Sequence, residues 1–488
     1  MKRMIQGFLS VAVFVIASLG GAAAAGAAET GQSLEDQVSR YLQGQMRERR
    51  IPGLQLAVVK GGKIVMLKSF GLAELPHSIP VTSRSVFSIN SATKSFTGVA
   101  IMQLVEQGKL DLAAPVSRYL SDLPVPWQAV TITQLLNHTS GLPDIISQQT
   151  SRLATGGGPD AAWRQVQTMP MDFAPGERYS YNQTNYLLLG KIIDQLSGQP
   201  FTRFIQTRQF DAVGMRQTGF GDMFDVIPDK APSYRFDADG KTLKQVADEF
   251  PAFLRTGAGI NSTAEDLARW IIALQKGTLV SSAGLTQMWQ RGHFNDGKAG
   301  PWSLGWPAIR DNAYRARAGI GGMRSAFYVY PENDLAVVIL TNLAGAAPEQ
   351  MIDIVASYFL PGLRSVSGGY AAYRLREQTQ KSGFENLDET LAQLKKQLGI
   401  AQPSEDDLNS WGYGLLSVGK KAQAIAVLRL ATRLYPDSFN VYDSLGEAYE
   451  AASEHDLAVQ NYNRSLALNA QNSHATERLR ALNPEKPQ

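Results

Sequence analysis

The feature that most constrains the fold of this chain is a helical stretch with no hydrophilic face. Residues 99–105 read Val-Ala-Ile-Met-Gln-Leu-Val and are apolar nearly all round. A helix of this kind has no face to turn toward water, so it must lie inside a large core. Gly108 is expected to end it, because glycine readily adopts the left-handed backbone found at helix C-termini. The rest of the chain must therefore fold around this helix.

The expected start of this helix carries Ser91 and Lys94, three residues apart. One helical turn places the two side chains on the same face. A serine hydroxyl needs a base to act as a nucleophile, and a lysine can be that base if burial lowers its pKa. The spacing alone is weak evidence, since a chain of this length holds about two such matches by chance, and Ser417 and Lys420 form a second. Ser91 could instead serve only as the N-cap of the helix.

The stretch around Ser91 is one of several segments that follow one another in a fixed order. The set resembles the penicillin-recognising serine hydrolases, the group of class C β-lactamases, D-alanyl peptidases and related esterases, whose signature includes Ser-x-x-Lys. An ordered set of segments is far more specific than one motif. The resemblance implies an α+β, β-lactamase-like fold over residues 34–365: an antiparallel sheet flanked by helices, with an inserted helical subdomain. The segments are residues 80–97, 103–112, 135–144, 178–190, 259–267 and 335–342.

The same resemblance implies that Ser91 is the nucleophile, Lys94 its base and Tyr181 a second catalytic group. Tyr181 lies at the family's Tyr-x-Asn position, and its register with the apolar residues 187–189 selects it over Tyr179 and Tyr186. A phenol near a buried ammonium loses its proton more easily, so it could relay a proton to the leaving group. The alternative is that Tyr181 only packs.

Two further positions depart from the family pattern. Gln183 stands where the family has asparagine, so an amide remains available to bind Lys94 and a substrate carbonyl. The glutamine side chain is longer than that of asparagine, which shifts the position of this amide. The family's Lys/His-Thr/Ser-Gly motif has no clean match, since residues 255–257 come too early in the order. The positional candidate is Arg317 with Gly319, where Arg317 could bind a substrate carboxylate and glycine could let a substrate backbone approach. A solvated Arg317 is the alternative.

Two other kinds of site are disfavoured by the residues. His138 and Asp144 could suggest a Ser-His-Asp triad, but the Gly-x-Ser-x-Gly turn that accompanies many such triads is absent. Five histidines without a His-x-x-x-His pair, and no cysteine, argue against a metal site. We therefore expect neither a metal nor a cofactor.

The pattern of apolar residues predicts strands at both ends of the family-like region. Residues 54–68 read as a hairpin around Gly61 and Gly62. Further strands are expected at residues 302–306, 325–330 and 335–341. Helices are expected over residues 34–50 and 187–196, and a capping box at residues 262–265 should open another. Strands at the two ends with helices between them favour an α+β domain.

The C-terminal part carries a repeat with a period of 34 residues. Gly412 and Gly446, Ala424 and Ala458, and Leu434 and Leu468 are each separated by this interval. The period and composition resemble tetratricopeptide repeats, which are helix–turn–helix units that can bind peptides. A purely structural appendage is the alternative. We expect a linker with one helix at residues 366–400 and a repeat domain at residues 401–488.

The N-terminus reads as a secretory signal. Lys2 and Arg3 precede an apolar run from residue 8 to 19, and residues 25–27 offer an Ala-x-Ala cleavage site. We therefore expect residues 1–27 to be removed, the protein to be periplasmic or secreted, and no stable membrane span to remain. The formal charge of +3 falls to +1 without Lys2 and Arg3, which gives no reason to expect a nucleic-acid partner.

Together these patterns predict an exported serine hydrolase that forms an acyl-enzyme on an ester or amide. The resemblance leaves small esters, D-amino-acid peptides and β-lactams open as substrates. The alternative function is a catalytically weak or inactive family scaffold that binds a protein partner through its repeats. The Ser91, Lys94 and Tyr181 set argues against this alternative.

Overall fold

The computed structural model describes residues 33–146, 153, 157–237 and 240–482. A seven-stranded antiparallel sheet forms its centre, in the order β3-β2-β1-β12-β11-β10-β9. Strands from both ends of the family-like region meet where β1 pairs with β12, for example at Leu54 opposite Thr341. The strands are β1 (Gly53–Lys60), β2 (Lys63–Glu74), β3 (Ile79–Pro80), β9 (Ala308–Arg310), β10 (Ala316–Gly321), β11 (Ser325–Tyr330) and β12 (Leu335–Thr341).

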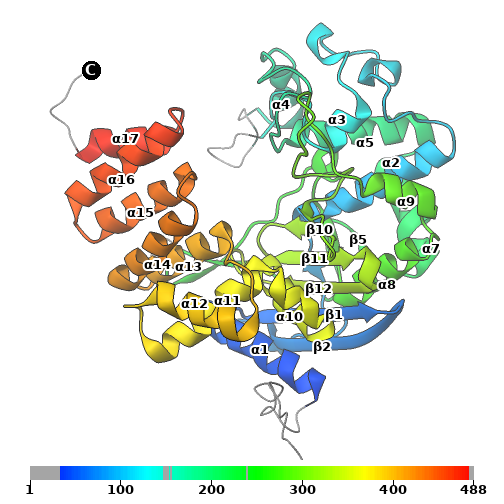
Figure 1. The fold of residues 1–488 in the computed structure, drawn as a ribbon. Helices are drawn as coiled ribbons and strands as arrows, with labels where there is room; N and C mark the ends of the chain where they lie inside the picture. The colour runs from blue at the N-terminus through cyan, green and yellow to red at the C-terminus, as the bar shows by residue number, and fades with distance from the viewer. Residues whose placement is uncertain (1–32, 147–152, 154–156, 238–239, 483–488) are drawn as a thin grey trace, which may run out of the picture.

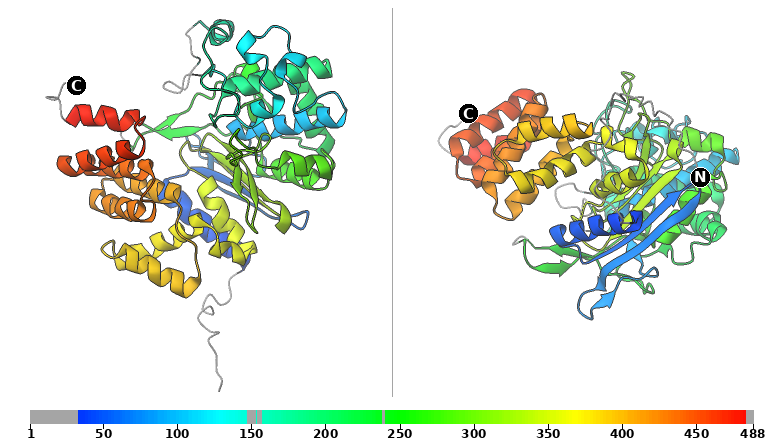
Figure 2. Two further views of the ribbon diagram at one scale, coloured as in Figure 1. Left: turned by 45° about the horizontal axis from the view of Figure 1, so that its top comes forward. Right: turned by 60° about the horizontal axis from the view of Figure 1, so that its bottom comes forward.

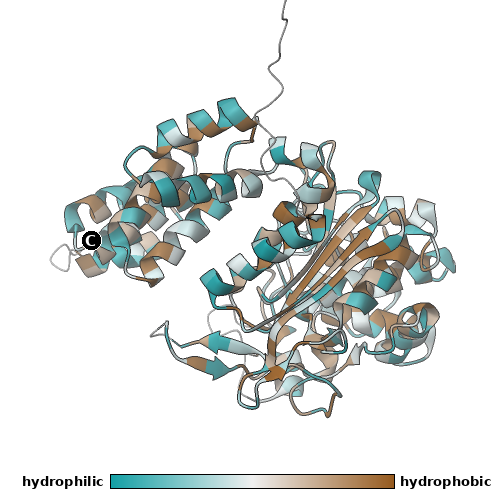
Figure 3. Cartoon of the chain, turned by 90° about the horizontal axis from the view of Figure 1, so that it is seen from below, coloured by the Kyte–Doolittle hydropathy of each residue, from teal (hydrophilic) through white to brown (hydrophobic). Residues whose placement is uncertain are grey.

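Helices cover both faces of this sheet (Figure 1). All residues of β12 are buried, and alternate residues belong to different hydrophobic clusters, as the two-residue period of a strand requires. Figure 3 shows the resulting band of hydrophobic strands between more polar helices. One layer contains α2 (Thr93–Glu106), α5 (Gln183–Ser197), α8 (Ala264–Gln275) and α9 (Ser282–Met288), and the other α1 (Leu34–Arg49) and α10 (Glu349–Phe359).

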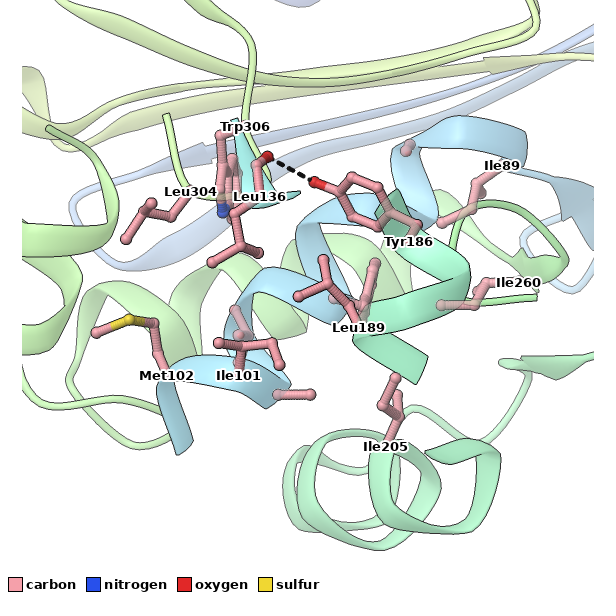
Figure 4. Packing of buried hydrophobic residues seen from close by; sticks show 14 of the residues in the cluster. Ile89, Ile101, Met102, Leu136, Tyr186, Leu189, Ile205, Ile260, Leu304 and Trp306 are labelled. Carbon is pink, nitrogen blue, oxygen red and sulfur yellow. Dashed lines mark hydrogen bonds between the residues drawn. The ribbon is translucent and has the colours of Figure 1, made fainter. Parts of the chain in front are cut away.

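Helix α2 is the buried centre that the sequence predicted. Every residue from Thr93 to Leu104 is buried. Ile101 and Met102 pack among side chains from α5 and from the loops around it (Figure 4). Gly108 follows the helix with φ of 70°, as expected for a glycine at this position.

The segment between β4 and β8 supplies the inserted helices and two small sheets. Strands β4 (Phe87–Ser88), β8 (Ile260–Ser262) and β5 (Gly219–Phe220) form one sheet, and β6 (Tyr234–Phe236) pairs with β7 (Leu243–Gln245) in a hairpin. The helices are α3 (Ile132–Leu136), α4 (Pro159–Val166), α6 (Phe201–Ile205) and α7 (Asp211–Val213), in addition to α5. The predicted α+β fold with an inserted helical part is therefore confirmed.

Two local predictions are wrong. Residues 302–306 form a loop, in which Gly305 takes φ of 89° and packs against Gly98 of α2; its buried apolar residues imitate a strand. Ser262 ends β8 opposite Phe87, so the N-cap of α8 is Thr263, whose side chain accepts from the Asp266 N–H. The predicted hairpin at Gly61 and Gly62 is confirmed by the pairing of β1 with β2.

Beyond the sheet the chain is helical to its described end. The stretch expected to be a linker with one helix contains two helices, and the first of them begins at Gly368. Buried residues of these helices join the cluster on the α1 and α10 face of the sheet. The helices are α11 (Gly368–Ser382), α12 (Leu387–Leu398), α13 (Glu405–Ser417), α14 (Lys421–Leu434), α15 (Phe439–Ala451), α16 (His455–Leu468) and α17 (Ser473–Leu482).

The last helices are compatible with the predicted repeats. Gly412 of α13 lies against Leu428 of α14, and Gly446 of α15 lies against Tyr462 of α16, so equivalent contacts recur at the 34-residue interval. The β6–β7 hairpin extends from the sheet domain toward these helices (Figure 2). The tetratricopeptide assignment and the domain boundaries stay predictions.

In the described part of the chain, no helix has both the length and the apolar character needed to cross a bilayer. The expected signal peptide, residues 1–27, lies outside the described residues.

Candidate active site

Ser91 lies in a tight turn at the entrance to α2. A 3₁₀ turn spans Asn90–Ala92, and the α-helix proper begins at Thr93. Ser91 is partly exposed, whereas Asn90 and Ala92 are buried. The N-cap position of α2 belongs to Ala92, with no side-chain cap bond, so the purely capping role considered for Ser91 is wrong. The turn therefore presents one polar side chain to the surface of an otherwise buried helix.

Lys94 lies one turn later and is only 1% exposed. Its Nζ donates to Oε1 of Gln183 at 3.0 Å and to the carbonyl oxygen of Gly257 at 2.9 Å. The same nitrogen lies 4.7 Å from the centre of the Tyr181 ring and 5.0 Å from that of Tyr186. Within the described residues, Lys94 has no carboxylate within ion-pair distance. The structure thus brings Lys94, Tyr181 and Gln183 together.

Tyr181 and Gln183 are placed by the loop that leads into α5. Asn182 caps α5, because its side chain accepts from the Asn185 N–H. The Asn182 N–H donates to Nδ1 of His138 at 3.1 Å, and the Gln183 N–H donates to Oδ1 of Asp144 at 3.0 Å. Tyr181 thus lies in the loop directly before the apolar helix α5. Within the described residues, no hydrogen bond joins Ser91 to Lys94 or Tyr181.

His138 supports this loop and does not act as a member of a triad. It is fully buried, and its ring centre lies 4.5 Å from that of Tyr181. Burial, helped by the charge of Lys94, holds the pKa of His138 well below its usual value, so the ring is neutral. Asp144 accepts from the backbone, and burial raises its pKa. Both residues serve the start of α5, which agrees with the sequence argument against a Ser-His-Asp triad.

The structure corrects the prediction for Arg317. This residue of β10 is 1% exposed. Its Nε donates to the carbonyl oxygen of Trp289 at 2.7 Å, its Nη1 to two further backbone carbonyls, and its Nη2 to Asp311 at 2.5 Å. All of these partners belong to the protein, so the guanidinium is neither solvated nor free to bind a substrate carboxylate.

Gly319 also has a different role from the one expected. A Cβ atom at this position would overlap the ring of Phe327 on β11, so the glycine makes room for a core side chain rather than for substrate. The close approach needed near the nucleophile occurs two residues later. At Gly321, a Cβ would lie 1.9 Å from the carbonyl oxygen of Ile89, two residues before Ser91. Strand β10 therefore ends directly against the Ser91 turn.

The register of β10 indicates which of its backbone groups face outward. The Ala318 N–H donates to the carbonyl oxygen of Pro307, on the side of β10 away from β11. Successive N–H groups of a strand alternate in direction, so the Ile320 N–H points to the same side as that of Ala318. Sequence alone did not identify this group, because its direction depends on strand pairing.

Other contacts were also missed from the sequence. The Gly257 carbonyl binds Lys94 although residues 255–257 come too early to match the family motif, and only the fold brings them to the site. Trp302 lies beside Tyr181 and stacks on Tyr179, with ring centres 5.7 and 6.1 Å away. These partly exposed aromatic rings lie next to the Lys94 cluster.

One group of potential metal ligands occurs among the described residues, in the repeat helices and not at Ser91. It consists of Asp443, Glu447 and His474. Each ring nitrogen of His474 lies within 3.1 Å of one of the two carboxylates, so ion pairing already explains the cluster.

Comparison with known proteins gives a consistent result. A family model described as Beta-lactamase matches residues 19–357. The chain is 25% identical over 320 residues to Protein flp of Staphylococcus aureus strain MW2, and the match covers 63% of each protein's length. The penicillin-binding protein from Bacillus halodurans superposes with a TM-score of 0.55 at 28% identity, over 64% of this chain and 98% of that one. The octameric penicillin-binding protein homologue from Pyrococcus abyssi gives 0.57 at 26%, over 67% and 77%.

Proposed function

The chain belongs to the beta-lactamase family, the penicillin-recognising serine hydrolases, and on this premise we propose that it forms an acyl-enzyme at Ser91 on small neutral esters. The observation that carries the proposal is the contact of Lys94 with both Gln183 and the Tyr181 ring, one helical turn from Ser91. A nucleophile beside a base that is itself held by a third group is the arrangement that covalent catalysis needs.

The first step is attack of the Ser91 Oγ on the ester carbonyl carbon. As the new C–O bond forms, the hydroxyl proton leaves Oγ for Lys94 or Tyr181. Lys94 is buried without an ion-pair partner among the described residues, and two neutral oxygen atoms hold its nitrogen in place. If Tyr181 accepts the proton as a phenolate, the neighbouring ammonium stabilises that negative charge. The same pair then delivers the proton to the leaving alcohol.

Backbone N–H groups stabilise the oxyanion in this mechanism. The Ser91 N–H lies in the turn before α2, and the Ile320 N–H points away from β11 at the end of β10. Contact of β10 with the Ser91 turn at Gly321 supports the pairing of these two donors. Preorganised donors of this kind typically contribute about 10²–10³ in rate each. A water molecule activated by the same acid–base pair then releases the acyl group from Ser91.

Neutral esters are proposed ahead of β-lactams and D-amino-acid peptides because both of these carry a carboxylate. The cation expected to bind that carboxylate, Arg317, is buried and committed to protein acceptors. The aromatic rings of Tyr179 and Trp302 offer apolar surface beside Tyr181 instead. Gln183 accepts from Lys94 through Oε1, which leaves its Nε2 group for a substrate carbonyl.

Export and partner binding are proposals that rest on the sequence. The basic and apolar N-terminus supports a periplasmic or secreted location, and the 34-residue repeat supports a protein partner. Cell fractionation with and without residues 1–27 tests the first, since removal should leave the protein in the cytoplasm.

The substrate proposal is tested by a panel of p-nitrophenyl acetate, p-nitrophenyl butyrate, a chromogenic cephalosporin and a D-alanyl-D-alanine peptide. We expect kcat/KM for the esters to exceed that for both carboxylate-bearing substrates. Arg317→Met should lower the stability of the protein and affect the two classes alike. A selective rise in KM for the carboxylate-bearing substrates would show that Arg317 binds them. Absence of turnover on the whole panel would favour a binding scaffold.

A further inference from the structure

The residue before Ser91 has a left-handed backbone conformation, which is uncommon for residues other than glycine. Asn90 has φ of 48° and is 5% exposed. Left-handed backbone is unfavourable for all residues except glycine, although asparagine tolerates it better than most. The backbone angles of Asn90 set the direction in which the Ser91 N–H and Oγ point. Whatever holds Asn90 in this conformation therefore also orients the nucleophile.

The side chain of Asn90 is held on two sides. Its Oδ1 accepts from Nη2 of Arg324 at 2.9 Å, and its Nδ2 donates to the carbonyl oxygen of Ser88 at 3.3 Å. A Cβ at Gly322 would lie 3.0 Å from the Asn90 amide, so the backbone after β10 packs closely against it. Ser325, next to Arg324, donates from Oγ to the carbonyl oxygen of Ile89 at 2.8 Å. Residues at the connection between β10 and β11 therefore hold the turn that contains Ser91 in place.

Arg324 is itself fixed by a buried carboxylate. Arg324 is 6% exposed, and its guanidinium binds Asp248 through both Nη atoms, at 2.8 and 3.2 Å. Asp248 is 7% exposed and also accepts from Oγ of Ser233 at 2.7 Å. A two-pronged arginine–carboxylate pair restricts the guanidinium far more than a single contact does. The Nη2 group can then reach Asn90 in only one orientation.

We propose that Asn90, Arg324 and Asp248 are positioning residues for the acylation of Ser91. Asp248 orients Arg324, Arg324 holds the Asn90 amide, and Asn90 in its left-handed conformation directs the Ser91 N–H and Oγ toward the carbonyl to be attacked. Acylation depends on the distance and angle of attack, and a displacement of about 1 Å can reduce it about 10²-fold. The inference rests on the proposed function, since it assigns a role within that reaction.

A pair of substitutions at Asn90 separates positioning from a merely structural role. Asn90→Gly and Asn90→Ala both remove the hydrogen bond to Arg324. Only glycine adopts the left-handed conformation without steric cost. The readouts are the acylation rate constant with a fluorophosphonate probe, kcat and KM on p-nitrophenyl acetate, and the thermal midpoint.

We expect both variants to acylate more slowly than the wild type with KM little changed. Asn90→Gly should lose about three- to tenfold, because the amide contact is gone but the left-handed conformation stays accessible, and Asn90→Ala about 10²-fold, because it loses both. Equal acylation rates for the two variants would overturn the inference while leaving the proposed function intact. A wild-type protein that fails to acylate would overturn the proposed function and this inference with it.

The role of Arg324 is tested with the same assays, in the wild type and in Asn90→Gly. Arg324→Met in the wild type should lower both the thermal midpoint and kcat. In the Asn90→Gly background it should lower the midpoint again but change kcat little, because its acceptor is already absent. If Arg324→Met does not fold, Arg324→Lys keeps a cation for Asp248 and is compared in the same two backgrounds. An equal loss of kcat in both backgrounds would mean that Arg324 does not act through Asn90.

Discussion

Gly321→Ala is the substitution whose effect follows most directly from the geometry of the site. A Cβ atom at Gly321 would lie 1.9 Å from the carbonyl oxygen of Ile89 and 2.9 Å from the carbonyl carbon. Because Cβ atoms essentially never approach another heavy atom closer than 3.0 Å, the Ser91 turn and β10 must separate by at least about 1.1 Å. The obstacle is backbone, so no change of rotamer can relieve it.

The expected loss follows from that displacement. A shift of about 1 Å between nucleophile and oxyanion donor reduces kcat about 10²-fold, which corresponds to about 2.7 kcal/mol of transition-state stabilisation. Overpacking should also destabilise the fold by about 1–3 kcal/mol. The assay is kcat and KM on p-nitrophenyl acetate, together with urea unfolding.

Gly319→Ala provides the matched control. It lies on the same strand and sheet face, and its Cβ would meet the Phe327 ring rather than the Ser91 turn. We expect a similar loss of stability, with kcat at least about ten times higher than in Gly321→Ala. A Gly321→Ala variant with kcat within threefold of the wild type would refute the close approach of β10 to the nucleophile. A rise in KM alone for Gly319→Ala would restore the substrate-contact role predicted from the sequence.

Three further outcomes are expected. Lys94→Ala and Tyr181→Phe should each lower kcat on p-nitrophenyl acetate about 10²–10⁴-fold. In the double variant the two losses of kcat should be far from additive, because both residues act on one proton. Additive losses would show that the two residues have separate roles. Burial lowers the pKa of Lys230 to about 8, so its charged form opposes folding below that pH and the penalty disappears as pH rises toward the unfolded value of 10.5. The unfolding free energy of the wild type, measured relative to Lys230→Met, should therefore rise by about 3 kcal/mol from pH 8 to 10.5, and a constant difference would contradict this burial. A chain ending at residue 400 should remain folded and active. A chain ending at residue 370 also loses the buried contacts of Leu375, Leu391 and Leu394, and it should be less stable than the longer chain by at least about 3 kcal/mol in urea unfolding. Equal stability of the two chains would show that α11 and α12 are not part of the core.

The elements predicted correctly are those set by local patterns. The hairpin at Gly61 and Gly62 needs only two glycines between apolar strands, and the burial of α2 follows from its lack of a polar face. The loop at residues 302–306 resembles a strand in sequence because buried loops can also be rich in tryptophan and leucine. Only the packing of Gly305 against α2 shows why an apolar loop is needed there.

The contacts of the candidate site likewise fall into those that could be predicted from the sequence and those that depend on the fold. The contact of Lys94 with Gln183 and Tyr181 could be anticipated because the resemblance supplied the relation between two distant segments. The Gly257 carbonyl and the enclosure of Arg317 could not, since each depends on strand order and on neighbours far along the chain. The hydrogen bond between Asn90 and Arg324 joins residues 234 positions apart, and no local sequence pattern predicts it.

The measurement that tests the central claim most directly is intact-mass analysis after incubation with a fluorophosphonate probe, followed by mapping of the labelled peptide. We expect one adduct, on the peptide that contains Ser91, and loss of this adduct in folded Ser91→Ala. Ser417→Ala, which alters the other Ser-x-x-Lys match, should still be labelled. Labelling that persists in Ser91→Ala would contradict the assignment of Ser91 as the nucleophile and the mechanism built on it.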